Sequence, residues 1–253
     1  MSLSNGVGVG TTLASGLRFD AVVGTGSSAE VWRATTASGI DVAVKLPRSE
    51  RASAVELVRR EHRVLSGLSN PRLPTVLDFI TIGEMPAIVF PYFSGGDLVS
   101  LLGSSHCHWA RPALQLAETL AYLHDSGWVH RDLKPRNVLF DATGDLRLID
   151  FSLAARIGSP TMGGGTPGYC PPERRRDGPV AVRDDEFAFA VTLYEMIEGR
   201  IPNPAHSPGL KPAMDAKLAA LMDLVADALK TKKNPSSGSV RPFLDVLKSL
   251  VHD

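Results

Sequence analysis

Short apolar runs separated by turn residues dominate the first third of the chain. Residues 17–48, LRFDAVVGTGSSAEVWRATTASGIDVAVKLPR, alternate in polarity and contain β-branched residues around two Gly/Ser clusters. This pattern predicts strand, turn, strand, turn and strand. Two more strand-like runs, PTVLDFITIG and PAIVFPYF, occupy residues 74–83 and 86–93.

One helical segment interrupts these strands. Residues 53–68 carry Val55, Val58, His62 and Leu65 at helical spacing. The segment therefore predicts an amphipathic helix beside a small sheet, and we assign both to residues 18–93. The small, Gly-rich residues 1–17 are expected to form a flexible tail.

The rest of the chain has mainly helical periodicity. Segments at residues 111–127, 184–199, 215–230 and 241–251 each favour a helix, and Gly127 would end the first. DLRLIDFSLAAR, at residues 145–156, predicts a short hairpin. The chain is thus expected to be α+β, with a mainly helical part over residues 94–253.

Composition narrows the function classes. The chain has 27 Lys and Arg and 27 Asp and Glu residues, so its near-zero net charge gives no support for a nucleic-acid partner. Two cysteines, Cys107 and Cys170, are too few for a disulfide framework and favour a reducing compartment. Neither a signal-peptide pattern nor a membrane-length apolar run is present. We expect a soluble, cytoplasmic protein with no membrane partner and an undetermined oligomeric state.

Two features of the first third could bind an anion. GTGSSAEV, at residues 24–31, lies between predicted strands, and glycines allow backbone to approach a phosphate, although an ordinary turn has the same composition. Lys45 lies on the third predicted strand and is flanked by apolar residues, where its ammonium either binds an anion or extends to water. The next helix offers Glu61 or its rival Glu56 as a counter-charge.

GWVHRDLKPRNVLF, at residues 127–140, places many polar groups between two apolar flanks. The carboxylate of Asp132 can accept a hydroxyl proton, the ammonium of Lys134 can neutralise a phosphate, and the amide oxygen of Asn137 can bind a hard cation. Asp150 ends the apolar run LRLID, and a carboxylate buried there needs a partner such as a metal ion.

Together these motifs resemble the eukaryotic-type protein kinases in their bacterial form, and the resemblance runs from Leu17 to Val251. GTGSSAEV, AVK, HRDLKPRN, IDFSLA, GTPGYCPPE, DDEFAFAVTLYEM and VRPF follow the order of that family. The resemblance implies a bilobal fold with a small antiparallel-sheet N-lobe and a larger helical C-lobe. It also implies that ATP and Mg²⁺ (or Mn²⁺) are bound.

Site roles follow from the resemblance. The implied catalytic residues are Asp132, Lys134, Lys45, Glu61 and Thr166. The implied metal ligands are Asn137 and Asp150. The implied nucleotide-binding residues are Gly24, Gly26, Val31, Ala43, Lys45, Phe90, Pro91, Phe93, Asp97 and Leu139.

The lysine of HRDLKPRN favours serine and threonine over tyrosine as acceptors. We therefore expect a kinase that phosphorylates Ser and Thr of protein substrates, including itself. The alternatives are a pseudokinase acting as a nucleotide-binding scaffold, a small-molecule phosphotransferase, and a module that phosphorylates a peptide during natural-product maturation. Loss of Lys45, Asp132 or Asp150 would mark a pseudokinase, but all three are present.

Four positions depart from the family pattern. Ala29 replaces the third loop glycine, and Pro171 replaces the first residue of Ala-Pro-Glu. Ser152 replaces the glycine of Asp-Phe-Gly, which would cost about 1 kcal/mol if that backbone needed φ > 0. Pro91 removes a backbone donor at a position that normally offers its carbonyl.

Structural and regulatory roles are implied as well. Glu173 is expected to pair with Arg241, and Asp185 to cap the catalytic-loop backbone. A phosphate on Ser159 or Thr161 could pair with Arg131. The apolar column of the family would consist of Leu65, His130 and Phe151. The cluster SHCHW, at residues 105–109, is spaced too tightly for a common zinc site and favours a linker.

Overall fold

The computed structural model describes residues 7–102, 109–160, 163–174, 178–202, 216–230 and 238–251. The SHCHW cluster, apart from its tryptophan, and Thr161 lie outside these ranges. The chain forms two compact units, Met1–Ser94 and Gly95–Asp253, which are described separately below.

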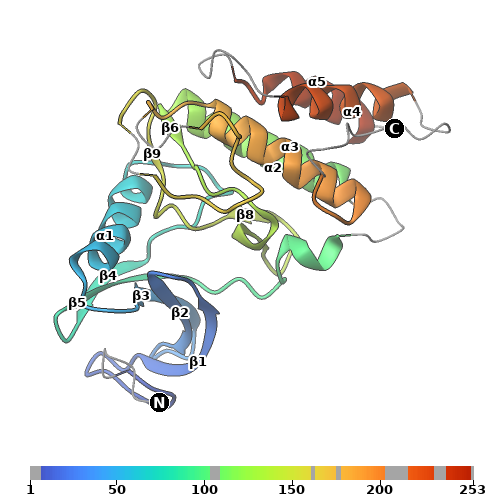
Figure 1. Cartoon of the computed structure of the whole chain (residues 1–253). Coiled ribbons are helices and arrows are strands. Elements are labelled where there is room, and N and C mark those ends of the chain that lie inside the picture. The colour runs from blue at the N-terminus through green and yellow to red at the C-terminus, as the bar shows by residue number, and fades with distance from the viewer. Residues whose placement is uncertain are drawn as a thin grey trace. The chain divides into compact units, whose positions relative to one another are not determined.

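A five-stranded antiparallel sheet forms most of the first unit (Figure 1). The order across the sheet is β1-β2-β3-β5-β4, so the last two strands exchange places relative to the sequence. The strands are β1 (Arg18–Thr25), β2 (Ala29–Thr35), β3 (Asp41–Pro47), β4 (Asp78–Ile82) and β5 (Met85–Pro91). All five predicted strands are confirmed.

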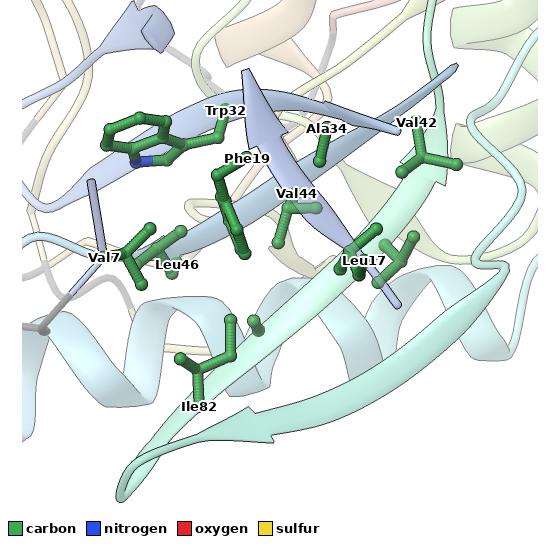
Figure 2. Packing of buried hydrophobic residues seen from close by; sticks show 11 residues of the cluster. Val7, Leu17, Phe19, Trp32, Ala34, Val42, Val44, Leu46 and Ile82 are labelled. Carbon is green, nitrogen blue, oxygen red and sulfur yellow. The ribbon is translucent and has the colours of Figure 1, made fainter. Parts of the chain in front are cut away.

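Apolar side chains fill one face of this sheet (Figure 2). Phe19 and Trp32 pack edge to face with ring centroids 5.8 Å apart, beside Val44. Where the sequence led us to expect a loose tail, Val7 is 3% exposed and joins this cluster. The N–H of Gly10 also donates to the carbonyl of Phe19, so the stretch from residue 7 packs on the sheet.

Helix α1 (Ala52–Ser66) contacts β3 and β5. Its buried stripe includes Val58, Glu61 and Leu65, whereas Val55 and His62, which we placed in the stripe, are only half buried. The helix therefore buries a carboxylate within its apolar face, and that carboxylate needs a partner.

Helices form most of the second unit. In Figure 1, α2 and α3 lie side by side, and α4 contacts both α3 and α5. Helix α3 is buried on nearly every side and ends at Gly199, whose φ of 71° suits glycine. The helices are α2 (Ala110–Asp125), α3 (Arg183–Glu198), α4 (Ala216–Leu229) and α5 (Arg241–Val251), as the periodicity predicted.

Short strand pairs carry the segments between these helices. β7 (Val138–Phe140) pairs with β8 (Leu146–Leu148), and β6 (Trp128–Val129) pairs with β9 (Ala155–Arg156). The hairpin predicted within residues 145–156 is therefore wrong. The turn at residues 141–145 joins β8 to the preceding β7, and β9 pairs with β6 instead of β8.

The predicted ion pair between Glu173 and Arg241 is also wrong. Glu173 Oε1 accepts a hydrogen bond from Arg183 Nε at 2.8 Å, whereas Arg241 pairs with Asp125 at an exposed site. Arg183 begins α3 and is 1% exposed, so it reaches Glu173 from the interior. In the part of the chain that the structure describes, no helix is both long and apolar enough to cross a membrane.

Candidate functional site

Strand register brings four of the predicted nucleotide-binding side chains to one face of the sheet. Val31 of β2 lies opposite Lys45 of β3, and Ala43 lies opposite Phe90 of β5. Residues paired directly across antiparallel strands share a face, and alternate residues of one strand do too. Val31 and Ala43 remain partly exposed, so this face keeps accessible apolar surface.

The Lys45 ammonium forms an ion pair with Glu61 of α1, while the rival Glu56 pairs with Arg63. The side chains of Lys45 and Glu61 are 8% and 1% exposed, so the pair lies in the interior. Such a pair fixes the position of the ammonium, because moving either side chain away would separate the other buried charge from its opposite charge.

The glycine-rich turn between β1 and β2 does not need its glycines for its own backbone. Gly24 and Gly26 lack positive φ, and a Cβ would meet its nearest atoms at ordinary distances of 3.6 and 3.5 Å. The N–H of Gly26 donates to the carbonyl of Ala29 at 2.9 Å. What the two glycines provide is an accessible backbone, with no side chain between it and a ligand.

The residues after β5 differ in how they can act. Pro91 is paired with Val42, so its side chain points away from the face of Lys45. Proline has no N–H, so only its carbonyl could contact a ligand. Phe93 follows two residues later and is half buried.

In the second unit, four predicted residues form one hydrogen-bonded network around Asp132. Lys134 Nζ donates to Asp132 Oδ2 at 2.7 Å and to Thr166 Oγ1 at 2.8 Å. Thr166 Oγ1 donates to Asp132 Oδ1 at 2.7 Å, and Asn137 Nδ2 donates to the Asp132 carbonyl at 2.8 Å. The network fixes the carboxylate between a cation and two polar side chains.

A buried carboxylate on α3 holds the backbone of this loop. Asp185 accepts hydrogen bonds at 2.8 Å from the N–H groups of His130 and Arg131, so the predicted cap is confirmed. Burial acts to raise the pKa of Asp185, but hydrogen bonding and charge from His124, with further contributions from His130 and Arg131, hold it below its ordinary value. The His130 ring packs edge to face on Phe151 at 4.8 Å, as expected.

Asp150 follows β8 in a left-handed conformation with φ of 66°. Aspartate tolerates this region because its side chain hydrogen-bonds locally, here with the N–H of Ser152 at 3.4 Å. Ser152 itself does not have positive φ, so the serine adopts this backbone without the cost that we anticipated. Backbone hydrogen bonding links Ile149, next to Asp150, to Asn137 at 2.9 Å.

The donor set of Asn137 and Asp150 fits a magnesium ion. The Nδ2 group of Asn137 is committed to Asp132, which leaves its Oδ1 as an oxygen ligand, and Asp150 contributes a carboxylate. Mg²⁺ is usually held by one or two such protein groups together with substrate phosphates. Near them, Asp97 forms an isolated bridge with Leu139, which brings two predicted nucleotide-binding residues together.

Sequence reasoning missed one charged cluster beside this site. Arg131 Nε and Arg174 Nε face Asp184 Oδ2 at 3.6 and 3.5 Å. Burial, with a further contribution from the charge of Asp185, raises the pKa of Asp184 although the two arginines act to lower it. Arg131 also donates to the carbonyls of Leu153 and Gly163 at 3.4 and 3.1 Å. The available signal was the doubled aspartate at the start of α3, of which we used only Asp185.

Comparison with known proteins places this geometry in a family. The model of the protein kinase domain matches residues 17–253. The chain belongs to the protein kinase family. The α+β fold expected from the motifs is thereby confirmed as that of a protein kinase domain.

Bacterial serine/threonine-protein kinases are among the curated relatives of this kinase domain. It is 35% identical to pkn2 of Myxococcus xanthus over 71% of this chain and 24% of that protein. It is 35% identical to PkaB of Streptomyces coelicolor over 77% and 52% of the two chains, and 30% identical to PrkC of Bacillus subtilis over 85% and 34%. The kinase domain thus matches between about a quarter and half of each relative. Nothing in the structure or these comparisons supports the pseudokinase alternative.

Proposed function

We propose that the chain is an ATP-dependent protein kinase that transfers the γ-phosphoryl group to serine and threonine hydroxyls of protein substrates, including its own. The observation that carries this proposal is the closed network of Asp132, Lys134, Thr166 and Asn137. The names of the bacterial relatives support the choice of serine and threonine. We further propose that the protein works in the cytoplasm and requires no nucleic acid or membrane partner.

Asp132 is proposed to orient the acceptor hydroxyl and to take its proton. Lys134 contacts both Asp132 and Thr166, so its ammonium can neutralise charge on the transferring phosphoryl group without leaving its place. Because these hydrogen bonds already hold the carboxylate and the ammonium in place, little reorganisation is needed during the reaction. Positioning and charge neutralisation then supply the rate.

Asn137 and Asp150 are proposed to hold the metal ion, which would neutralise the phosphates when bound. Lys45, fixed by Glu61, is proposed to bind the α- and β-phosphates, and the backbone of Gly24 and Gly26 to cover them. In the first unit, Val31, Ala43, Phe90, Pro91 and Phe93 are proposed as adenine-binding residues. In the second unit, Leu139 is proposed to bind adenine and Asp97 the ribose.

The test is phosphoryl transfer by the purified chain beside an Asp132→Asn variant. Labelled ATP, Mg²⁺, and one acidic and one basic carrier protein are incubated with each, and phosphoamino acids are identified. We expect phosphoserine and phosphothreonine from the wild type, and a rate loss of roughly 10²–10⁴-fold in the variant. Thermal unfolding checks that the variant is folded. Equal transfer by both proteins would refute the role of Asp132, and ATP-dependent stabilisation without transfer would favour the nucleotide-binding scaffold.

A further inference from the structure

A cavity of about 360 Å³ opens beside the Asp132 network. This volume is near the lower end of ligand pockets, about 300–1,000 Å³, so the cavity has room for a side chain of a bound peptide. We call it the Arg136 cavity. It is lined by Val99, Leu102, Lys134, Pro135, Arg136, Thr166, Tyr169 and Glu195.

Its position ties the cavity to the acceptor residue of a substrate. Lys134 and Thr166 line the cavity, and both contact the carboxylate of Asp132 at 2.7 Å. An extended peptide advances about 3.3 Å per residue. A substrate whose hydroxyl faces Asp132 would therefore place a residue only a few positions away in this cavity.

The charged groups of the cavity differ in what they already bind. The Lys134 ammonium is committed to Asp132 and Thr166, and Glu195 Oε2 accepts the O–H of Tyr169 at 2.5 Å. Arg136 is exposed, and no ion pair joins it to any residue in the described ranges. The charged group of the cavity that is accessible to a ligand is thus a cation, and a guanidinium matches a carboxylate with two parallel hydrogen bonds.

Arg136 is also anchored where it can act. It lies in the 3₁₀ turn Pro135–Asn137, between the buried Pro135 and the buried Asn137 of the catalytic network. Val99, Leu102 and Pro135 give the cavity an apolar wall that can cover the methylene groups of an entering side chain. A basic side chain would meet the charge of Arg136 and would have to share Glu195 with Tyr169.

We propose that the Arg136 cavity binds an acidic side chain of the protein substrate, near the phosphorylated residue, and that Arg136 selects it. The inference rests on the proposed kinase function and names a substrate class for it: serine or threonine flanked by aspartate or glutamate.

Peptide kinetics test this selection. A parent peptide with one serine among alanines is varied to Glu or Arg at each of the flanking positions in turn. We expect Glu at one position to raise kcat/KM about tenfold over alanine, chiefly through KM, because one charge-assisted contact is gained. Arg at that position should lower it.

Two variants and a control assign the effect. Arg136→Ala should abolish the preference while leaving kcat for the parent peptide within about twofold, and Arg136→Glu should reverse it. Arg111→Ala removes one exposed positive charge on α2 and should leave the preference intact. The proposal is overturned if the preference survives in Arg136→Ala, or if the wild type favours Arg and Glu195→Gln abolishes that.

The kinase function and the substrate class are refuted by different results. Phosphorylation of all peptides at similar rates would overturn the substrate class and leave the kinase function standing. No phosphorylation of any peptide or carrier protein would overturn the kinase function and this inference with it.

Discussion

Arg183 offers the sharpest test of how the second unit is held together. Its guanidinium donates to Glu173 and Glu186 at 2.8 Å each and to the carbonyl of Lys230 at 2.7 Å, while the side chain is 1% exposed. Arg183→Met retains most of the aliphatic part of the side chain. It removes the guanidinium that Glu173 and Glu186 both contact. Removing one partner of a buried ion pair costs about 3–5 kcal/mol. At roughly 2–4 °C per kcal/mol, the melting temperature should fall by about 6–20 °C.

Arg241→Met is the matched control, because Arg241 is the arginine that sequence resemblance assigned to Glu173. Its pair with Asp125 is exposed, at 60% and 62% of the two side chains. Exposed pairs contribute about 0–1 kcal/mol, so this variant should unfold within a few degrees of the wild type. Both variants are followed by thermal and urea unfolding monitored by circular dichroism.

A double-mutant cycle with Glu173→Gln isolates the pair itself. The effects of Arg183→Met and Glu173→Gln on the free energy of unfolding should be non-additive by about 0.5–3 kcal/mol, because each variant removes the same interaction. The effects of Arg241→Met and Glu173→Gln on the free energy of unfolding should be additive. Equal losses for the two arginine variants, or additivity in the first cycle, would refute the assignment.

Three further predictions concern titratable groups whose pKa is shifted by their surroundings. Asp185→Asn should lose about 1–3 kcal/mol at pH 7, since the amide would face two backbone N–H donors. Because the folded pKa of Asp185 is lowered, its contribution is present above about pH 4 and is lost as pH falls, so urea unfolding should show a smaller acid-induced loss in the variant. Burial and Glu195 raise the pKa of Tyr169, so the ultraviolet titration of wild type minus Tyr169→Phe should show no phenol ionising near pH 10; a step there contradicts it. Burial also raises the pKa of Cys170, so in a Cys107→Ser background its alkylation at pH 7.5, followed by mass spectrometry, should be slower than that of glutathione, and an equal rate would contradict the burial.

Local sequence signals predicted the elements well, because each element carries its own periodicity and end signals. Gly127 and Gly199 follow α2 and α3 with φ of 80° and 71°, as glycines after helices often do. The local pattern alone did not decide whether Glu61 or Glu56 pairs with Lys45. Only Glu61 continues the buried stripe of Val58 and Leu65, so packing of α1 on the sheet decided which carboxylate meets Lys45.

Partners distant in sequence were predicted less well. A motif names a residue type, but the burial of each candidate decides which one forms the pair. Arg183 reaches Glu173 from ten positions away because the start of α3 is buried, whereas the later Arg241 lies on the surface. The sequence did not predict the Arg136 cavity for the same reason, because its lining combines the catalytic loop with Tyr169 and Glu195, which are distant in sequence.

Asp184 changes what can be expected of Arg131. The motif suggested a guanidinium waiting for a phosphate on Ser159 or Thr161, but Arg131 already contacts Asp184 and two backbone carbonyls of the following segment. A phosphate brought to Arg131 would be repelled by an ionised Asp184, which is itself buried. An ionised Asp184 would therefore supply, within the folded chain, the negative charge that a phosphate would bring. Phosphorylation of Ser159 or Thr161 stays a prediction, and its effect through Arg131 requires Asp184 to be displaced or neutral.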